Sequence, residues 1–146
     1  MILAKPTEFM NVSGPPVAAL ANFHKIPPDR VLVLLDDAAI PLGRLRLRAA
    51  GSDGGHNGLA SVIQSLGTEE VPRIRIGIGP KPERMDLADF VLARLTKDET
   101  AILDETLDRC VSAVKLWIEK GPAIAGNYAN VKPNEPATTK EQEDEI

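Results

Sequence analysis

Cysteine and aromatic residues are scarce in this chain of 146 residues, which contains one Cys and only 3% Phe, Trp and Tyr. The single cysteine, Cys110, excludes a disulfide framework within the chain and weakly favours a reducing compartment. No apolar run approaches the ~18 residues that a membrane-spanning helix needs. The first ten residues lack the charged start and long apolar stretch of a secretion signal. We therefore expect a cytoplasmic protein that does not cross a membrane.

Several catalytic patterns are missing as well. Neither of the two histidines, His24 and His56, has a second metal ligand at a useful spacing, so we expect no metal site. The chain has no Gly-x-Ser-x-Gly motif and no P-loop lysine. Its glycine-rich stretch 51–58 does not directly follow a strand pattern, so we expect no nucleotide cofactor. The residues still allow water activated by a base, with amide groups that bind a carbonyl oxygen.

The charge is unevenly distributed. The net charge is −4, and residues 134–146 alone carry five acidic side chains and one lysine. Residues 41–84 carry seven basic and four acidic side chains, which permits an anionic partner. The last residues are rich in Pro, Thr, Lys and acids. We therefore expect one domain over residues 1–130 and a disordered acidic tail over 131–146.

Apolar patterns predict at least three strands. The continuous run 31–35 suits a strand that is buried on both faces, whereas 44–48 and 73–79 alternate between apolar and polar residues. Residues 2–4 fit the end of a further strand. We expect an α/β fold with three layers, in which helices flank a mixed, mostly parallel sheet. The short connection 36–43 predicts that strands 31–35 and 44–48 are antiparallel neighbours.

Helix signals occupy the intervening segments. Ser13, followed by two prolines, predicts a capped helix that ends before 26–29. A second helix is expected to end at Gly67, and a third to begin with a capping box formed by Thr96 and Glu99. The third helix ends at Gly121. Its expected apolar stripe comprises Leu103, Leu107, Cys110, Val111, Val114 and Trp117. Residues 90–95 are apolar, and their structural type is left open.

A few polar side chains are candidates for chemistry. Asn11 could bind a substrate or simply form a turn, and Asp36 could act in a site or cap a loop. Asp37 is expected to be its exposed neighbour. His56 and Asn57 lie between glycines at the start of a helix, whose N–H groups suit an anion or a carbonyl oxygen. The glycines alternatively serve only to make a tight loop.

Five segments occur in the order found in bacterial-type peptidyl-tRNA hydrolases. They are "KPTEFMNVSG", "VLVLLDDAAIPLGRLRLR", "GSDGGHNGLASVIQSLG", "RIRIGIG" and "FVLARL". The chain resembles this family over about residues 2–130, and "FMN" followed by "GGHNGL" is the specific part. The resemblance implies hydrolysis of the ester between peptide and tRNA, without a cofactor, by a mixed sheet flanked by helices.

The resemblance also implies roles for individual residues. Asn11 and Asn57 would hold the peptide, with Met10 and His56 beside them in the cleft. Asp36 would orient the catalytic histidine. Arg48 and Arg75 would contact tRNA phosphates. The implied partner is peptidyl-tRNA, through its acceptor stem and its peptide, and we expect a monomer.

The family's segment "GLGNPG…Y…TRHN", which carries its catalytic histidine and a central strand, has no match in this sequence. We therefore expect these 146 residues alone to have little activity, since loss of a general base typically costs ~10²–10⁴-fold. An alternative is a non-catalytic RNA-binding module or an inactive truncated paralogue of the same fold. An interaction protein that uses its acidic tail is a third reading.

Overall fold

The structure is a computed structural model that describes residues 1–7, 9–81, 84–86 and 95–131. They form two compact units. The helical unit comprises residues 1–33 and 49–73, and the sheet unit comprises residues 34–48 and the described residues from 74 onward. The expected tail 131–146, apart from Val131, and the apolar segment 90–95, apart from Leu95, lie outside the described residues.

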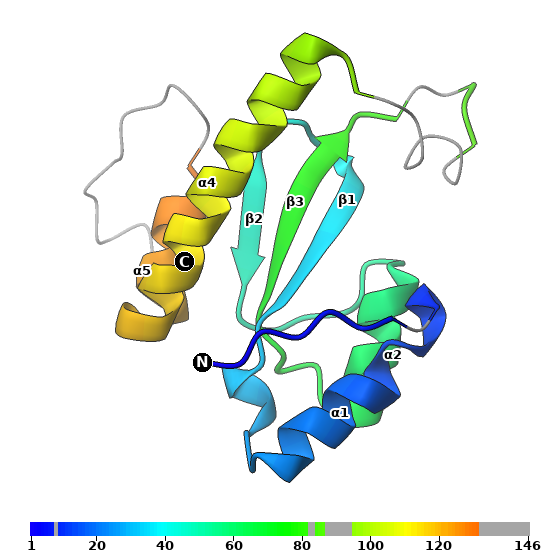
Figure 1. The fold of residues 1–146 in the computed structure, drawn as a ribbon, viewed down its shortest axis with the longest axis vertical. Helices are drawn as coiled ribbons and strands as arrows, with labels where there is room; N and C mark the ends of the chain where they lie inside the picture. The colour runs from blue at the N-terminus through cyan, green and yellow to red at the C-terminus, as the bar shows by residue number, and fades with distance from the viewer. Residues whose placement is uncertain (8, 82–83, 87–94, 132–146) are drawn as a thin grey trace. The chain divides into compact units, whose positions relative to one another are not determined.

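The helical unit contains two α-helices and two short 3₁₀ helices. In chain order these are η1 (Met10–Val12), α1 (Gly14–Phe23), η2 (Pro28–Arg30) and α2 (Asn57–Leu66). Helix α1 packs against α2, and η1 packs against α2 as well (Figure 1). Residues 2–4 are not part of a strand, which corrects that expectation: no neighbouring strand among the described residues supplies hydrogen bonds to them.

The two α-helices approach closely at Gly14. The Gly14 N–H donates to the Ser61 hydroxyl at 2.9 Å, and a Cβ at Gly14 would overlap the Ser61 carbonyl oxygen. Ser13 precedes α1 as expected but does not cap it, because Pro15 and Pro16 have no N–H to offer. Its hydroxyl instead donates to the Met10 carbonyl at 2.8 Å. The helix therefore begins through its contact with α2 rather than through a cap.

The sheet unit contains three strands and two helices. They are β1 (Val33–Pro41), β2 (Leu45–Arg48), β3 (Arg73–Gly79), α4 (Lys97–Lys120) and α5 (Pro122–Ala129). The strand order is β1-β3-β2. Figure 1 shows β1 and β3 running in the same direction and β2 running in the opposite direction, so the sheet is mixed. Of the helices in the described ranges, none combines the length and apolar character needed to cross a bilayer.

The connection between β1 and β2 crosses β3, so the expected pairing of these two strands is wrong. Two glycines make the crossing possible. A Cβ at Gly77 would overlap the Pro41 carbonyl oxygen, and one at Gly79 would overlap the Ala38 carbonyl oxygen. The Leu42 N–H then donates to the Gly79 carbonyl at 2.7 Å. A short connection can pass directly over a strand where that strand has no side chains.

Strand β1 is not buried on both faces as the continuous apolar run suggested. Leu35 is 6% exposed, but Leu34 is 50% exposed. The strand also continues through Asp36 and Asp37 to Pro41. In the described part of the sheet, β1 pairs with β3 only and is therefore an edge strand.

Helix α4 begins with the expected capping box. The Thr96 hydroxyl accepts from the Glu99 N–H at 3.1 Å, and the Glu99 carboxylate accepts from the Thr96 N–H at 2.9 Å. The buried face differs from the expected stripe: Leu107 and Val111 are 40% and 53% exposed. The fully buried side chains of α4 are Thr106, Cys110 and Ala113. Small residues form this face because α4 packs along α5, whose own buried residues are Ala and Gly.

Cys110 is a core residue, as expected, and burial raises the pKa of its thiol. Helix α5, which the sequence patterns did not reveal, follows at once with Pro122 in its first turn. Residue Asn130, just after α5, bonds to the outer edge of β2. Its side-chain oxygen accepts from the Leu47 N–H at 2.7 Å and its side-chain nitrogen donates to the Leu47 carbonyl at 3.2 Å.

Candidate functional site

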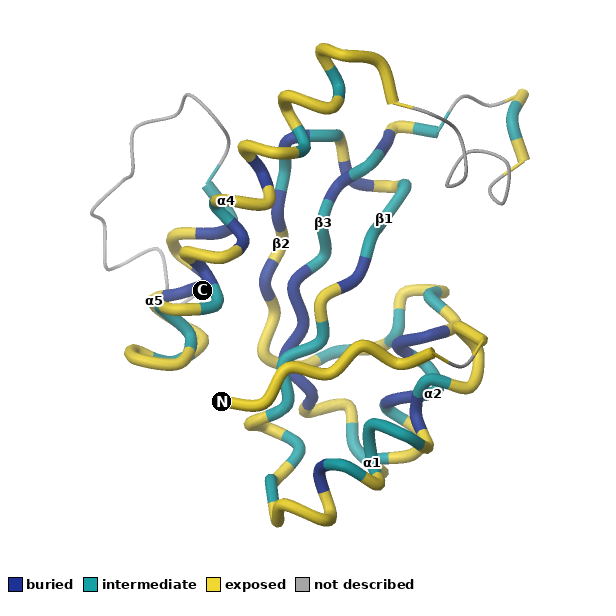
Figure 2. Tube along the Cα trace, in the orientation of Figure 1, coloured by how far each residue is buried: buried dark blue, intermediate teal, exposed yellow. Residues whose placement is uncertain are grey.

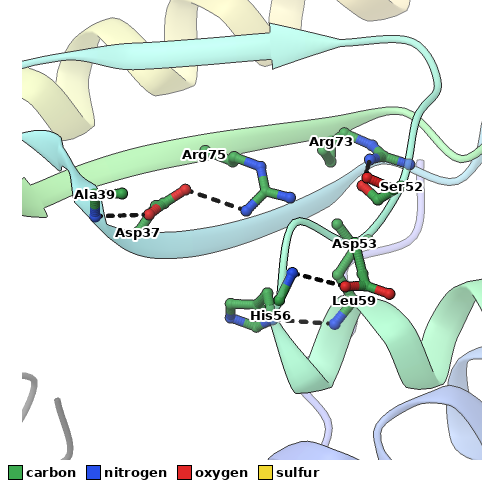
Figure 3. A network of polar contacts seen from close by, with 9 residues as sticks. Asp37, Ala39, Ser52, Asp53, His56, Leu59, Arg73 and Arg75 are labelled. Carbon is green, nitrogen blue, oxygen red and sulfur yellow. Dashed lines mark hydrogen bonds and ion pairs between the residues drawn. The ribbon is translucent and has the colours of Figure 1, made fainter.

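His56 is the N-cap of α2. Its Nδ1 accepts a hydrogen bond from the Leu59 N–H at 3.1 Å, so this nitrogen is engaged by the helix backbone (Figure 3). Serine, threonine, aspartate or asparagine usually makes this bond. The helix signal found by sequence analysis was therefore correct, but the role of the imidazole in starting the helix was missed.

The loop before His56 is held by hydrogen bonds between its own residues. The Asp53 carboxylate accepts from the Gly55 N–H at 2.7 Å, and the Asp53 carbonyl accepts from the His56 N–H at 3.1 Å. Gly54 and Gly55 have φ values of 61° and 86°, which favour glycine over other residues. The glycines thus permit a tight turn that delivers His56 to the start of α2.

Met10 lies against this helix start. A Cβ at Gly58 would stand 2.6 Å from the Met10 Sδ and 3.0 Å from the His56 Cε1. The absence of a side chain at Gly58 therefore leaves room for the thioether. Asn11 follows on the same 3₁₀ turn, and both Asn11 and Asn57 are exposed. The helical unit thus brings the η1 turn and the start of α2 together.

Arg73 is a residue of this region that sequence analysis did not single out. It is 2% exposed, and its guanidinium donates to backbone carbonyls on both sides of the α2 segment. The acceptors are Ser52, Gly51, Glu69 and Val71, at 2.9, 3.0, 3.1 and 2.7 Å. The alternating pattern had placed Arg73 on a polar face, and its burial carries no separate sequence signal.

In the sheet unit, Asp36 and Asp37 are consecutive residues of β1 and point to opposite sides of the strand. Asp36 is half-buried. Asp37 is not the exposed residue that we expected. Its carboxylate accepts from the Ala39 N–H at 2.8 Å and pairs with Arg75 of β3 at 3.2 Å (Figure 3). The side chains of Arg75 and Asp37 are 11% and 20% exposed.

Arg48 lies on the solvent face of β2, together with Arg46. Leu45 and Leu47 are 1% and 3% exposed, whereas both arginines are exposed, as the alternation predicted (Figure 2). One guanidinium nitrogen of Arg48 donates to the Leu47 carbonyl at 3.0 Å. Arg48 therefore presents positive charge to solvent more openly than Arg75 does.

The candidate residues are divided between the two units. Met10, Asn11, His56 and Asn57 belong to the helical unit, and Asp36, Arg48 and Arg75 belong to the sheet unit. That Asp36 joins the two asparagines in one groove stays a prediction. Within the described ranges, His, Cys, Asp and Glu side chains form no group of three that could hold a metal ion.

Known proteins match this chain over most of its length. The family model described as peptidyl-tRNA hydrolase matches residues 1–139. The chain belongs to the peptidyl-tRNA hydrolase family. The peptidyl-tRNA hydrolase of Desulfitobacterium hafniense is 48% identical over 128 residues, which cover 88% of this chain and 69% of the relative. That of Elusimicrobium minutum is 45% identical over 130 residues, covering 89% and 70%.

A solved structure shows the same fold. The crystal structure of peptidyl-tRNA hydrolase from Acinetobacter baumannii matches with a TM-score of 0.79 and 31% sequence identity, covering 87% of this chain and 64% of that chain. This chain thus spans less than two thirds of the solved protein's length. The match confirms the expected fold class, an α/β peptidyl-tRNA hydrolase fold with a mixed sheet flanked by helices.

Proposed function

We propose that this chain binds peptidyl-tRNA and takes part in hydrolysis of the ester between the peptide and the tRNA. The family membership supports the activity, and one observation supports the location. The η1 turn, with Met10 and Asn11, packs against the start of α2, where His56 and Asn57 lie. Two exposed carboxamides beside a helix N-terminus can bind peptide groups, because each amide offers both a donor and an acceptor.

The start of α2 supplies the complementary chemistry. The first four N–H groups of a helix have no partner within the helix, and their dipoles favour a developing negative charge. His56 takes up one of these groups, that of Leu59. The His56 N–H donates to the Asp53 carbonyl. This leaves the Asn57 and Gly58 N–H groups for an ester carbonyl oxygen that gains charge during attack by water. Asn11 and Asn57 would hold the peptide so that its ester carbonyl reaches this point.

The sheet unit would hold the RNA. Arg48 and Arg46 lie two residues apart on the exposed face of β2, so they can contact neighbouring phosphates without reading sequence. Arg75 would contribute less, because its guanidinium is bonded to Asp37 and only 11% of the side chain is exposed. Asp36 would orient the general base. We further propose that a single copy binds the acceptor stem and peptide in the cytoplasm.

These 146 residues lack a histidine that matches the family's general base. His56 uses Nδ1 to cap α2, and His24, exposed at the end of α1, has no match to the family's catalytic histidine. We propose that the chain alone binds its substrate and turns it over slowly. An assay on N-acetyl-aminoacyl-tRNA tests this. Turnover equal to that of a longer relative would contradict it.

Binding is the sharper test of the site. A suitable probe is an RNA minihelix whose 3′ end carries an N-acetyl-aminoacyl group in a stable amide linkage. We expect Asn57→Ala and Asn11→Ala each to weaken acylated-probe binding about tenfold, through loss of one or two hydrogen bonds at ~1 kcal/mol each. Asn22→Ala, an exposed asparagine on α1, is the matched control. Equal affinities for all three variants would refute the assignment.

His56 has two separable roles. In His56→Asn the imidazole is lost but a good N-cap residue takes its place. His56→Ala removes both the imidazole and the capping hydrogen bond, at a cost of about 1 kcal/mol in stability. If the ring only caps the helix, His56→Asn keeps both the stability and the probe affinity. If the ring also contacts the substrate, His56→Asn keeps stability but loses affinity. Thermal unfolding and the probe titration together distinguish these roles.

A further inference from the structure

Arg73, the first residue of β3, is buried, and its guanidinium binds four backbone carbonyls. Its Nε donates to the Val71 carbonyl at 2.7 Å and its Nη1 to the Ser52 carbonyl at 2.9 Å. Its Nη2 donates to the Gly51 carbonyl at 3.0 Å and to the Glu69 carbonyl at 3.1 Å. A guanidinium has five donors in a fixed planar fork, so one side chain can bind four carbonyls.

These acceptors lie at the two ends of one segment. Gly51 and Ser52 precede α2, while Glu69 and Val71 follow it. The Gly51 N–H also donates to the Glu69 carbonyl at 3.1 Å, next to the guanidinium. Arg73 therefore ties the start of the α2 segment to its end.

The glycine-rich loop begins at Gly51 and Ser52, the two residues whose carbonyls Arg73 binds. Ser52 is followed by Asp53, whose carbonyl and carboxylate accept from the His56 and Gly55 N–H groups. Two hydrogen bonds therefore link the guanidinium to His56: the one that Arg73 donates to the Ser52 carbonyl at 2.9 Å, and the one that the His56 N–H donates to the carbonyl of the next residue, Asp53, at 3.1 Å. A loop rich in glycine has little stiffness of its own, because glycine restricts its backbone least. The hydrogen bonds at its two ends must therefore fix its position.

We propose that Arg73 is a positioning residue for the substrate site: it fixes the start of loop 51–56 and thereby the placement of His56 and Asn57. This inference rests on the proposed function for its effect on substrate, but not for its effect on the loop. Arg73 touches no substrate. Lysine cannot replace it, because a single ammonium has three donors and no fork to reach carbonyls on both sides.

The first experiment measures the loop without any ligand. In native-state hydrogen exchange of Arg73→Lys, we expect the protection of the His56 and Leu59 amides to fall at least tenfold more than that of the α1 amides. Arg109→Lys is the matched control, because the Arg109 guanidinium likewise donates to backbone carbonyls, those of Gly43 and Val131, in the sheet unit. In Arg109→Lys, the protection of the His56 and Leu59 amides relative to that of the α1 amides should not change. An equal loss of protection at α1 and at the loop in Arg73→Lys would overturn the proposal.

If Arg73→Lys does not fold, the wild-type chain gives the answer. With urea rising below the unfolding transition, the Arg73 Nε–H and the His56 amide should lose protection together, since the loop cannot open while its anchor holds. If the His56 amide opens at urea concentrations where the Arg73 Nε–H stays protected, Arg73 does not fix the loop.

The second experiment measures the consequence for binding. The acylated minihelix and the same minihelix without its acyl group are titrated against wild type and Arg73→Lys. We expect about tenfold weaker binding of the acylated probe and unchanged binding of the bare one. An unchanged preference for the acylated probe would overturn the positioning role. If wild type binds neither probe, the proposed function fails, and the exchange ratio alone decides the role of Arg73.

Discussion

Strands β2 and β3 have similar sequences and different surroundings. Both alternate arginine with an aliphatic residue, as "RLRLR" over 44–48 and "RIRIGIG" over 73–79. On β2 the arginines 46 and 48 are exposed. On β3, Arg73 is 2% exposed, and the Arg75 side chain is 11% exposed and paired with Asp37.

Position in the sheet accounts for the difference. β3 lies between β1 and β2, whereas β2 pairs only with β3 among the strands that the structure describes. Alternation determines which side of a strand a residue occupies, because successive side chains point to opposite faces. It does not determine what lies over that side. The same pattern therefore produces a solvent face on one strand and two internal contacts on its neighbour.

The largest effect should come from the glycines of β3, Gly77 and Gly79, which occupy the positions that arginine holds in the alternation. In Gly79→Ala the new methyl group would overlap the Ala38 carbonyl, so we expect a loss of about 3 kcal/mol in the free energy of unfolding. Urea unfolding followed by Trp117, the only tryptophan, reports on the sheet unit. Gly126→Ala is the control: nothing lies within 3.6 Å of its Cβ, and α5 should gain up to ~1 kcal/mol. Equal effects of the two substitutions would show that the close approach of the Ala38 carbonyl is not what makes alanine costly at Gly79.

An intermediate effect is expected for the ion pair of β3. Arg75→Met leaves the Asp37 carboxylate, which is 20% exposed, without its cation. We expect a loss of about 1 kcal/mol, because solvent still screens part of the pair. A double-mutant cycle with Asp37→Asn isolates the coupling between the two side chains. A coupling energy near zero would place Arg75 with the exposed arginines of β2.

The smallest effect on stability belongs to β2. Arg46→Met and Arg48→Met should each change the free energy of unfolding by less than about 0.5 kcal/mol, because both side chains are exposed. Under the proposed function, each should reduce the salt dependence of minihelix binding by a slope of ~1. Arg30→Met, an exposed arginine of η2, is the control. A slope that stays unchanged in both β2 variants would remove RNA binding from this face.

Local signals made much of the fold predictable. The Thr96–Glu99 capping box, the end of α2 at Gly67 and the alternation of β2 each depend on residues close together in sequence. The crossing of β3 by the chain between β1 and β2 was not predictable in this way, because it depends on Gly77 and Gly79, almost forty residues further along the chain. Ser13 shows the opposite case, since the two prolines that prevent its cap, Pro15 and Pro16, stand only two and three residues after it.

The candidate site was predictable to a similar extent. The glycines around His56 correctly indicated a loop that leads into a helix. The capping bond to Leu59 was missed because histidine seldom makes it. Arg73 was missed for a different reason: its acceptors are backbone carbonyls, which every residue carries, so no side-chain pattern marks them.

The carboxamide of Asn130 has a consequence for how this protein meets other chains. It occupies both hydrogen-bonding groups of Leu47, just as an adjoining strand would. A foreign peptide that approached β2 sideways would find the middle of a four-residue strand already engaged. One asparagine thus discourages growth of the sheet into fibrils on that side, and it does so without adding charge.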